Sequence, residues 1–521
     1  MENSVSLSPR PALSDFANQF PDKPATISGT TGGTVTFGEL DAGSLRLARY
    51  FSAHGLQPGD VVALLLKNST THLTISWGAE RSGMIFVPVN WHLGPAEAAY
   101  IVSNSGAKAL VASAELASLA ESVAAANPQL DIALAVDGSI PGFDDYETAL
   151  GSVPASVRSH ERQGAYMFYS SGTTGAPKGI MPAVPDAPFG AGLPIETLLK
   201  AQFGMGTDTV YLSLGPLYHS APQGWSLGAQ SHGGTTVIVD SFDAEQTLAL
   251  IEQYRVTHVQ MVPTMFVRIL KLPQHVREKY DLSSLRLVFH AAAPCPPDVK
   301  ERMIEWLGPC VIEFYSASEF NSLFIIDSAS WLTHRGSVGR ALIGTPHILD
   351  DDGNELAVDE VGEIWIENGN RFEYHGEPAK TAAAYNELGW STLGDLGSLD
   401  ADGYLYLSDR RTDLIISGGV NIYPREIEDT LTLHEAITDV AVLGIPDDEM
   451  GQQVKAVVQL APGYTADTAM ESELIDYCRS RLARFKCPRS VDFVTELPRL
   501  PSGKLLRRTL SDQYSNSGSR P

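Results

Sequence analysis

The stretch YSSGTTGAPKGI, residues 169–180, decides how the whole chain is interpreted. Its three glycines let the backbone bend tightly, while four hydroxyl side chains and the Lys178 ammonium offer hydrogen-bond donors. Such a loop can surround phosphate oxygens. It differs from the common phosphate-binding loop, in which Ser or Thr follows the lysine, because Gly179 follows Lys178 here. A turn that needs only flexibility has no use for these donors, so the stretch predicts a phosphate site.

Around this loop, apolar runs alternate with segments of helical period. Strand-like runs occupy 61–66, 85–89, 109–112, 235–239, 258–262 and 285–290, and helical patterns occupy 71–81 and 244–254. Strands separated by helices indicate α/β sheets in which most strands are parallel.

The pattern changes after about residue 340. Short alternating segments at 363–366 and 404–407, separated by turns rich in Asp and Gly, predict a small antiparallel β unit. A compact α+β pattern follows, with helices over 424–433 and 472–482 and strands over 439–445 and 453–460. We therefore predict an α/β fold with two domains, residues 1–409 and residues 410–521.

Composition excludes several classes of protein. The 521 residues include 37 Lys and Arg against 62 Asp and Glu, a net charge of −25, so nucleic acid and anionic membranes would repel the chain. We find no apolar run long enough to span a bilayer and no secretory signal pattern. The four cysteines lack the spacing of metal ligands or disulfide pairs, which favours a cytoplasmic enzyme.

Six further motifs follow the first in a fixed order. They are PLYHSAP (216–222), AAAP (291–294), YSASE (315–319), GWSTLGDLG (389–397), DRRTDLIISGGVNIYPREIE (409–428) and LPRLPSGKLLRR (497–508). With these motifs, residues 16–510 resemble the adenylate-forming superfamily of acyl-CoA synthetases, luciferases and peptide-synthetase adenylation domains. The chain is most similar to the acyl-CoA synthetases.

The resemblance implies a fold, cofactors and a two-step reaction. The N-terminal domain would hold α/β sheets and a small β subdomain, and the C-terminal domain would be a mobile α+β lid. ATP, with Mg²⁺, would react with a carboxylate to give an acyl-adenylate, and the thiol of coenzyme A would then displace AMP. Oligomeric state, including a homodimer, is left open.

Each site residue takes its expected role from the motif that it matches. The catalytic residues would be Lys504, which bridges the carboxylate and the α-phosphate, Glu319, which holds the metal, and His219, which positions the acid. The residues that bind ATP would be Ser170, Ser171, Gly172, Thr173, Thr174, Gly175, Lys178, Ala292, Ala293, Pro294, Tyr315, Ser316, Ser318, Asp395 and Arg410. The acyl pocket would involve His219, Gly224, Trp225, His290, Ala291, Ser316 and Ala317, and the hinge and coenzyme A loop would involve Thr412, Gly418 and Gly419.

Two positions depart from the family pattern. Thr412 stands where the hinge usually has Asp or Lys, and Val420 stands where the glycine loop usually has Glu. Both departures concern the second half-reaction, so adenylation with transfer completed by a separate protein is the alternative. The basic segment 479–508, with nine Arg and Lys, is equally compatible with a solvated helix face and with attraction of the coenzyme's phosphates.

Small side chains in the expected acyl pocket favour a bulky or long hydrophobic monocarboxylic acid, either aliphatic or polycyclic. An alternative from another class rests on GWSLG (224–228), which matches the G-x-S-x-G motif of serine hydrolases with Ser226 as nucleophile. That motif needs a strand directly before it, and the residues before it here are SAPQ. A non-catalytic binding module would be favoured only if Lys504, Glu319 or the Ser/Thr/Gly loop were missing.

Overall fold

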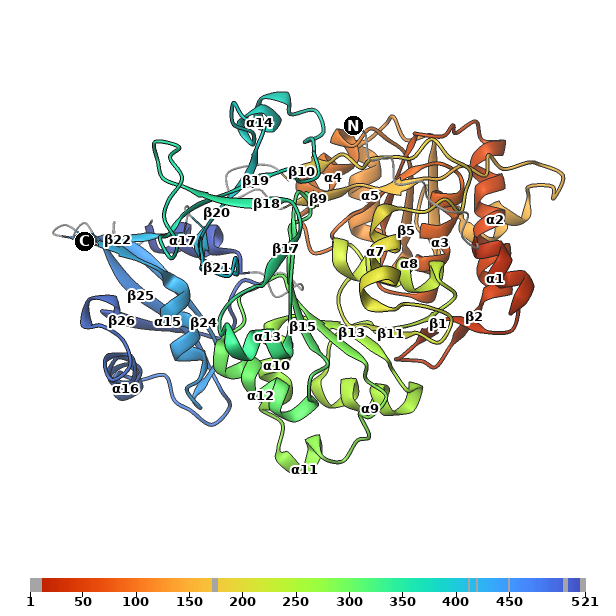
Figure 1. Cartoon of the computed structure of the whole chain (residues 1–521). Helices are drawn as coiled ribbons and strands as arrows, with labels where there is room; N and C mark the ends of the chain where they lie inside the picture. Colours follow the sequence, from red (N-terminus) through yellow and green to blue (C-terminus); the bar gives the residue numbers. More distant parts are fainter. Residues whose placement is uncertain are drawn as a thin grey trace. The chain divides into compact units, whose positions relative to one another are not determined.

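The computed structural model describes residues 12–170, 177–410, 413–417, 420–447, 450–499 and 505–515, excluding the side chains at 409, 410, 421, 508 and 515. The chain forms two compact units. The first unit holds Met1–Met261, Leu272–Val288 and Phe372–Thr381, and the second holds Val262–Lys271, Phe289–Arg371 and Ala382–Pro521. Figure 1 labels the elements of both units, which are described separately below.

The first unit contains two sets of mostly parallel strands. One sheet has, in spatial order, β7 (Asp144–Asp145), β6 (Ile132–Val136), β5 (Ala107–Ser113), β3 (Val61–Leu65), β4 (Ile85–Pro88) and β8 (Ala165–Tyr166), all parallel. The other set runs β13 (His258–Met261), β11 (Val210–Ser213), β12 (Thr235–Ile238), β1 (Pro24–Ser28) and β2 (Thr34–Thr36), and only β2 is antiparallel to its neighbour. The prediction of α/β sheets with mostly parallel strands is confirmed.

Helices connect these strands, as parallel pairing requires. They are α1 (Leu13–Gln19), α2 (Phe37–Ala53), α3 (Thr70–Arg81), α4 (Pro95–Asn104), α5 (Ala117–Ala126), α6 (Tyr146–Gly151), α7 (Pro194–Phe203), α8 (Ser220–Ser231), α9 (Ala244–Tyr254) and α11 (Gln274–Arg277), with a 3-10 turn at Ala114–Leu116. Several begin at a side-chain cap: the Thr36 hydroxyl accepts a hydrogen bond from the Glu39 N–H at the start of α2, and the Ser69 hydroxyl accepts one from the His72 N–H at the start of α3.

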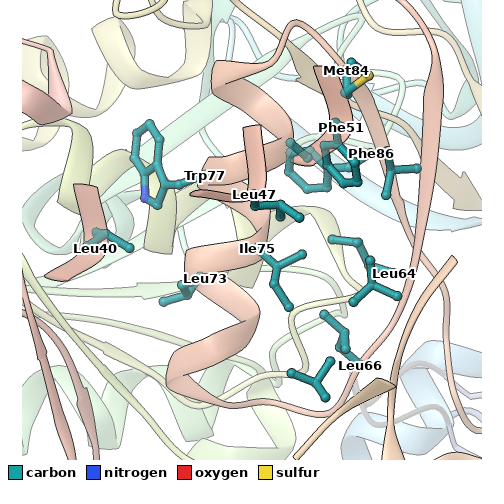
Figure 2. Packing of buried hydrophobic residues seen from close by; sticks show 14 of the residues in the cluster. Leu40, Leu47, Phe51, Leu64, Leu66, Leu73, Ile75, Trp77, Met84 and Phe86 are labelled. Atoms are coloured by element: carbon teal, nitrogen blue, oxygen red, sulfur yellow. The ribbon is translucent and has the colours of Figure 1, made fainter. Parts of the chain in front are cut away.

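A cluster of buried hydrophobic residues joins α2 and α3 to β3 and β4 (Figure 2). Leu47, Ile75, Leu64 and Phe86 are all fully buried. Burying a side chain of this size contributes about 1.5–3 kcal/mol to stability. This packing holds β3 in place, and Asn68 follows the end of that strand by three residues.

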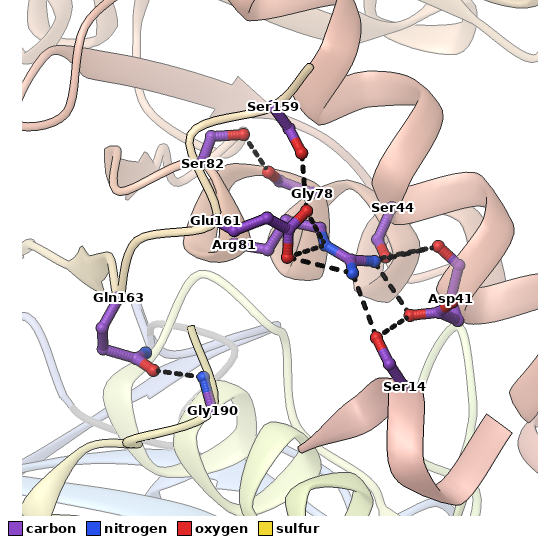
Figure 3. A network of polar contacts seen from close by, with 10 residues as sticks. All are labelled: Ser14, Asp41, Ser44, Gly78, Arg81, Ser82, Ser159, Glu161, Gln163 and Gly190. Atoms are coloured by element: carbon purple, nitrogen blue, oxygen red, sulfur yellow. Dashed lines mark hydrogen bonds and ion pairs between the residues drawn. The ribbon is translucent and has the colours of Figure 1, made fainter. Parts of the chain in front are cut away.

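A buried arginine ties the first helices together (Figure 3). The Arg81 guanidinium, 4% exposed, donates to the Asp41 carboxylate at 2.9 Å and to the Ser44 hydroxyl at 2.9 Å. It also donates to Ser14 at 3.1 Å and to Glu161 at 3.2 Å. Because a buried charge is costly unless it is paired, these partners explain how Arg81 lies in the core.

The second unit begins with antiparallel strands. β14 (Leu287–His290) has two residues in each unit, because the division falls between residues 288 and 289. β15 (Val311–Tyr315), β16 (Leu323–Asp327) and β17 (Arg340–Ile343) follow it and pair antiparallel. The predicted small β unit is confirmed as a sheet of β18 (Thr345–Leu349), β19 (Gly362–Glu367), β20 (Ser391–Leu399) and β21 (Leu405–Arg410). The helices here are α10 (Pro263–Leu270), α12 (Pro297–Leu307) and α13 (Ser328–Thr333); α14 (Pro378–Ala383) has its first four residues in the first unit and its last two in the second.

The remainder of the second unit has the predicted α+β character. β22 (Ile415–Ser417) and β23 (Val420–Ile422) form a hairpin, and β24 (Ile437–Asp447), β25 (Gly451–Leu460) and β26 (Ser490–Val494) form a sheet. The helices are α15 (Pro424–Thr432), α16 (Thr468–Arg479) and α17 (Arg507–Ser515), with a 3-10 turn at Arg484–Lys486. Within the described residues, none of the helices has the length and apolar character that crossing a bilayer requires.

Candidate active site

The two ends of the Ser/Thr/Gly loop lie opposite each other on a hairpin. β9 (Phe168–Ser170) pairs antiparallel with β10 (Lys178–Ile180), and Ser170 is in register with Lys178. Residues 171–176, which include Ser171, Gly172, Thr173, Thr174 and Gly175, lie outside the described residues. The structure therefore brings two predicted phosphate-binding residues together at the base of the loop.

Aromatic side chains support this hairpin. The Lys178 ammonium lies 4.8 Å from the centre of the Tyr374 ring, and the Tyr169 hydroxyl donates to Asn104 at 2.7 Å. A Cβ atom at Gly179 would lie 2.9 Å from Cζ of Tyr169, so this glycine is required for the close contact. Burial raises the pKa of Tyr169, which keeps its hydroxyl protonated as a donor.

The segment that leads to His219 is held by Asn68, which no motif predicted. The Asn68 amide donates to the carbonyls of Gly215 and Val239, each at 3.0 Å, and its oxygen accepts from the Leu217 N–H at 2.9 Å. His219, half-buried, occupies the N-cap position of α8, with its ring centre 4.7 Å from that of Tyr218. A polar residue just beyond a buried parallel strand was the available signal for Asn68.

Gly224 and Trp225 lie on α8. A Cβ atom at Gly224 would lie 3.1 Å from the Tyr166 hydroxyl, so this glycine leaves room for the tyrosine. Trp225, 4% exposed, packs between Phe203 and Tyr211, with ring centres 5.3 and 6.3 Å away. Both residues help to shape the interior of the first unit, and their place in an acyl pocket stays a prediction.

The serine-hydrolase alternative is excluded by the position of Ser226. This residue lies in the middle of α8, fully buried, and its hydroxyl donates to the Pro222 carbonyl at 2.6 Å, one turn earlier in the helix. A nucleophile of that class stands exposed on a sharp turn between a strand and a helix. Ser226 is a core residue that satisfies its own polar group.

His290 ends β14 and is fully buried. Neither ring nitrogen has a hydrogen-bond partner within the described residues; the nearest charged atom recorded is Glu313 Oε2, 3.6 Å from Nε2. Burial, together with the nearby Lys300 ammonium, lowers the pKa of His290 well below its usual range. This shift favours the uncharged imidazole, whose two ring nitrogens are buried beside Glu313.

The loop that follows contains strained backbone. Ala291 is buried, whereas Ala292 is exposed and has a φ of +71°, in the left-handed region. This conformation costs an alanine about 1–2 kcal/mol. Strain of this kind collects at functional sites, where the surrounding structure enforces it. The positive φ marks a turn at Ala292, and the placement of residues 292–294, including Ala293 and Pro294, beside a ligand stays a prediction.

Two residues predicted to bind the nucleoside are in direct contact. The Tyr315 hydroxyl, at the end of β15, donates to Asp395 Oδ2 in β20 at 2.5 Å. Asp395 is in register with Arg410 on the neighbouring strand β21, although the side chain of Arg410 is not described. Tyr315 and Asp395 are 80 residues apart in sequence, and Asp395 and Arg410 are 15 apart. The three motifs that contain them thus meet at one place in the second unit.

The loop after Tyr315 is closed by its own polar groups. The Ser316 hydroxyl donates to the Ser322 carbonyl at 2.7 Å, and Phe320 has a φ of +50°. Between them, Ala317 and Glu319 are half-buried and Ser318 is exposed. The loop therefore carries the Ser318 hydroxyl and the Glu319 carboxylate three and four residues after Tyr315.

Several predicted residues lie outside the described residues, namely Thr412, Gly418, Gly419 and Lys504. Their neighbours are nevertheless defined. Ser417 pairs with Val420 across the hairpin that flanks the glycine loop. Arg499 pairs with Leu505 on either side of the lysine segment, and the Arg499 guanidinium binds both carboxylate oxygens of Asp439 at 2.5 and 2.8 Å.

Comparison with known proteins defines the class. Residues 13–373 match the model of the AMP-binding enzyme family, and residues 426–504 match that of the AMP-binding enzyme C-terminal domain. The fold and ordered motifs are those of adenylate-forming enzymes. The chain belongs to the AMP-binding enzyme family, as an AMP-forming acid–thiol ligase of the acyl-CoA synthetase type.

Individual relatives align along nearly the whole chain. A feruloyl-CoA synthase from Amycolatopsis sp. is 33% identical over 91% of this chain and 93% of its own length. The long-chain-fatty-acid–CoA ligase FadD13 of Mycobacterium tuberculosis is 30% identical over 96% of this chain and 98% of its own length. The ATP-bound structure of MatB from Rhodopseudomonas palustris has a TM-score of 0.79, with 27% identity, over 97% of this chain and 100% of that chain.

Proposed function

We propose that this enzyme activates a bulky or long hydrophobic monocarboxylic acid with ATP and transfers the acyl group to coenzyme A. The observation that carries the nucleotide part is the contact between Tyr315 and Asp395 opposite Arg410. The acid part is supported by relatives that are named for ferulate and for long-chain fatty acids.

On the nucleotide, each group has a distinct task. Asp395 accepts hydrogen bonds from the ribose hydroxyls, with Arg410 beside it, while Tyr315 and residues 292–294 contact adenine. Ser318 donates to the α-phosphate, and the loop based on Ser170 and Lys178 surrounds the outer phosphates. These groups supply positive charge and donors, which phosphoryl chemistry needs more than proton transfer.

The residues present fit a magnesium ion that is held mainly by the nucleotide. Glu319 provides one half-buried carboxylate, and the described residues contain no group of three His, Cys, Asp or Glu placed to hold a metal. Mg²⁺ commonly binds one or two carboxylates together with substrate phosphates and water. When bound, it would neutralise charge on the phosphates, and Glu319 would orient it.

On the acid, we place His219 near the carboxylate and His290 along the acyl group. The lowered pKa of His290 favours the uncharged ring, which would bring no charge to the acyl site. Ala291, Ser316 and Ala317 have small side chains, which leaves volume for a large acid. Thr412 and Val420 depart from the family pattern at positions expected to serve the second half-reaction, so product analysis with and without coenzyme A tests the alternative in which a separate protein completes the acyl transfer.

The acid is tested with a panel that includes acetate, free amino acids, fatty acids of increasing length, and aromatic and polycyclic acids. We expect kcat/KM, measured by pyrophosphate release, to rise with apolar size by roughly tenfold for every two methylene groups buried, at about 0.8 kcal/mol per methylene. The proposal is wrong if acetate or an amino acid is the best substrate.

A further inference from the structure

A buried ion pair in the second unit has no role in the function described above. Lys300 in α12 donates to Glu313 Oε2 in β15 at 2.6 Å. Lys300 is 0% exposed and Glu313 is 6% exposed, and the ammonium also lies 4.8 Å from the centre of the Trp331 ring. Removing two charges from water offsets much of their mutual attraction, so such a pair is weak evidence for stability alone.

The pair connects the elements that carry the nucleoside residues. Lys300 lies in the first turn of α12, which begins directly after the loop 291–296. Glu313 precedes Tyr315 by two residues, and alternate residues of a strand point to the same face, so both belong to one face of β15. His290, the last residue before the loop, approaches the same Glu313 oxygen at 3.6 Å.

The Glu313 carboxylate therefore binds Lys300, after the loop, and lies 3.6 Å from His290, before the loop. It also lies on the same strand as Tyr315. Apolar packing is non-directional and would tolerate a small slide of α12 along β15. An ammonium–carboxylate hydrogen bond is directional and fixes the two elements at one register. Such a slide would displace the loop before α12, with its strained residue Ala292, relative to Tyr315 on β15.

We propose that Lys300 and Glu313 are positioning residues that hold Tyr315 and the loop 291–294 in the geometry that binds the nucleotide. This inference rests on the nucleotide-binding roles proposed above for Tyr315 and that loop. It assigns to the pair an effect on the KM for ATP.

The test compares K300M with the double variant K300M/E313M. The single variant leaves Glu313 buried without its partner, so it should unfold at a lower temperature and lose most activity. The double variant replaces both side chains with apolar groups of similar length and should recover the melting temperature. We expect it to keep a KM for ATP raised about tenfold or more, because small misplacements of binding groups are costly.

Recovery of both the melting temperature and the ATP KM in the double variant would overturn the inference, because apolar packing would then be sufficient. If the double variant does not fold, E313Q gives the answer, since it keeps the shape and removes the charge. A raised ATP KM in E313Q supports the inference, and an unchanged one contradicts it.

R81M is the matched control: Arg81 is also a buried cation paired with a carboxylate, and its loss should lower the melting temperature without changing the ATP KM.

The variant D395A separates this inference from the proposed function. If D395A leaves the ATP KM unchanged, the nucleotide site itself has been placed wrongly. If D395A raises it and the double variant does not, only the role of the Lys300–Glu313 pair is wrong.

Discussion

Replacing Lys504 with Ala is expected to lower the rate of adenylation roughly 10²–10³-fold, as the loss of one group that stabilises transition-state charge commonly does. The first half-reaction joins two anions, a carboxylate and a phosphate, and this lysine is the cation that we place between them. The second half-reaction begins from an acyl-adenylate and lacks this repulsion. We therefore expect K504A to convert supplied acyl-adenylate and coenzyme A to the thioester at nearly the normal rate.

The two half-reactions are measured separately, by acid-dependent exchange of pyrophosphate into ATP and by chromatography of acyl-CoA formed from synthetic acyl-adenylate. K455A is a suitable control, because Lys455 is another lysine of the C-terminal part of the chain, in β25, and binds Asp492 at 2.5 Å. Its loss should affect stability and leave both rates within a few-fold of normal. Equal loss of both half-reactions in K504A would contradict the assigned role.

Asp395→Ala is expected to lower kcat/KM for ATP by about 10²-fold, through a raised KM. The carboxylate is proposed to accept two hydrogen bonds from ribose, and a hydrogen bond to a charged group contributes about 1.5–3 kcal/mol. The variant Y315F, which removes only the hydroxyl that donates to Asp395, should produce a smaller change in the same direction. Isothermal titration of ATP and steady-state kinetics provide the two readouts.

The matched control for this prediction is D400N. Asp400 follows β20 and its carboxylate accepts from the N–H groups of Asp402 and Tyr404 at 3.0 and 2.9 Å, so it holds a turn and has no proposed role in binding. D400N should lower the melting temperature and leave the ATP KM unchanged. If D395A and D400N behaved alike, the effect of Asp395 would be structural and its placement at ribose would be wrong.

The sequence predicted the elements of the fold well where apolar period was strong. The helix Ala244–Tyr254 has the predicted bounds, and β3 and α3 differ from their predicted ends by one residue. The prediction of the start of α16 was less accurate. It was expected to begin at residue 472, and it begins at Thr468. Asp467 caps it by accepting from the Met470 N–H, and that capping signal precedes the apolar pattern on which the prediction relied.

In the candidate site, only residues that belong to a recognisable motif could be predicted from the sequence. Tyr315, Asp395 and Arg410 were grouped through the family resemblance, and the contact between the first two agrees with that grouping. Asn68 belongs to no motif, and its three hydrogen bonds depend on tertiary contacts that local sequence does not encode.

Lys300 was missed although a signal existed. In α12, Lys300 precedes Met303 and Ile304 by three and four residues, so helical period places it on the buried face. A lysine on an apolar face calls for a buried partner, and the partner, Glu313, lies on the next strand. The helical period therefore indicates burial at a position where charge alone would suggest exposure.

The most direct test of the account is mass spectrometry of the best acid with ATP and Mg²⁺, with and without coenzyme A. We predict acyl-adenylate alone when the thiol is absent, and acyl-CoA with stoichiometric AMP when the thiol is present. Acyl-adenylate that persists in the presence of coenzyme A would contradict it, and would mean that this chain activates the acid while another protein completes the transfer.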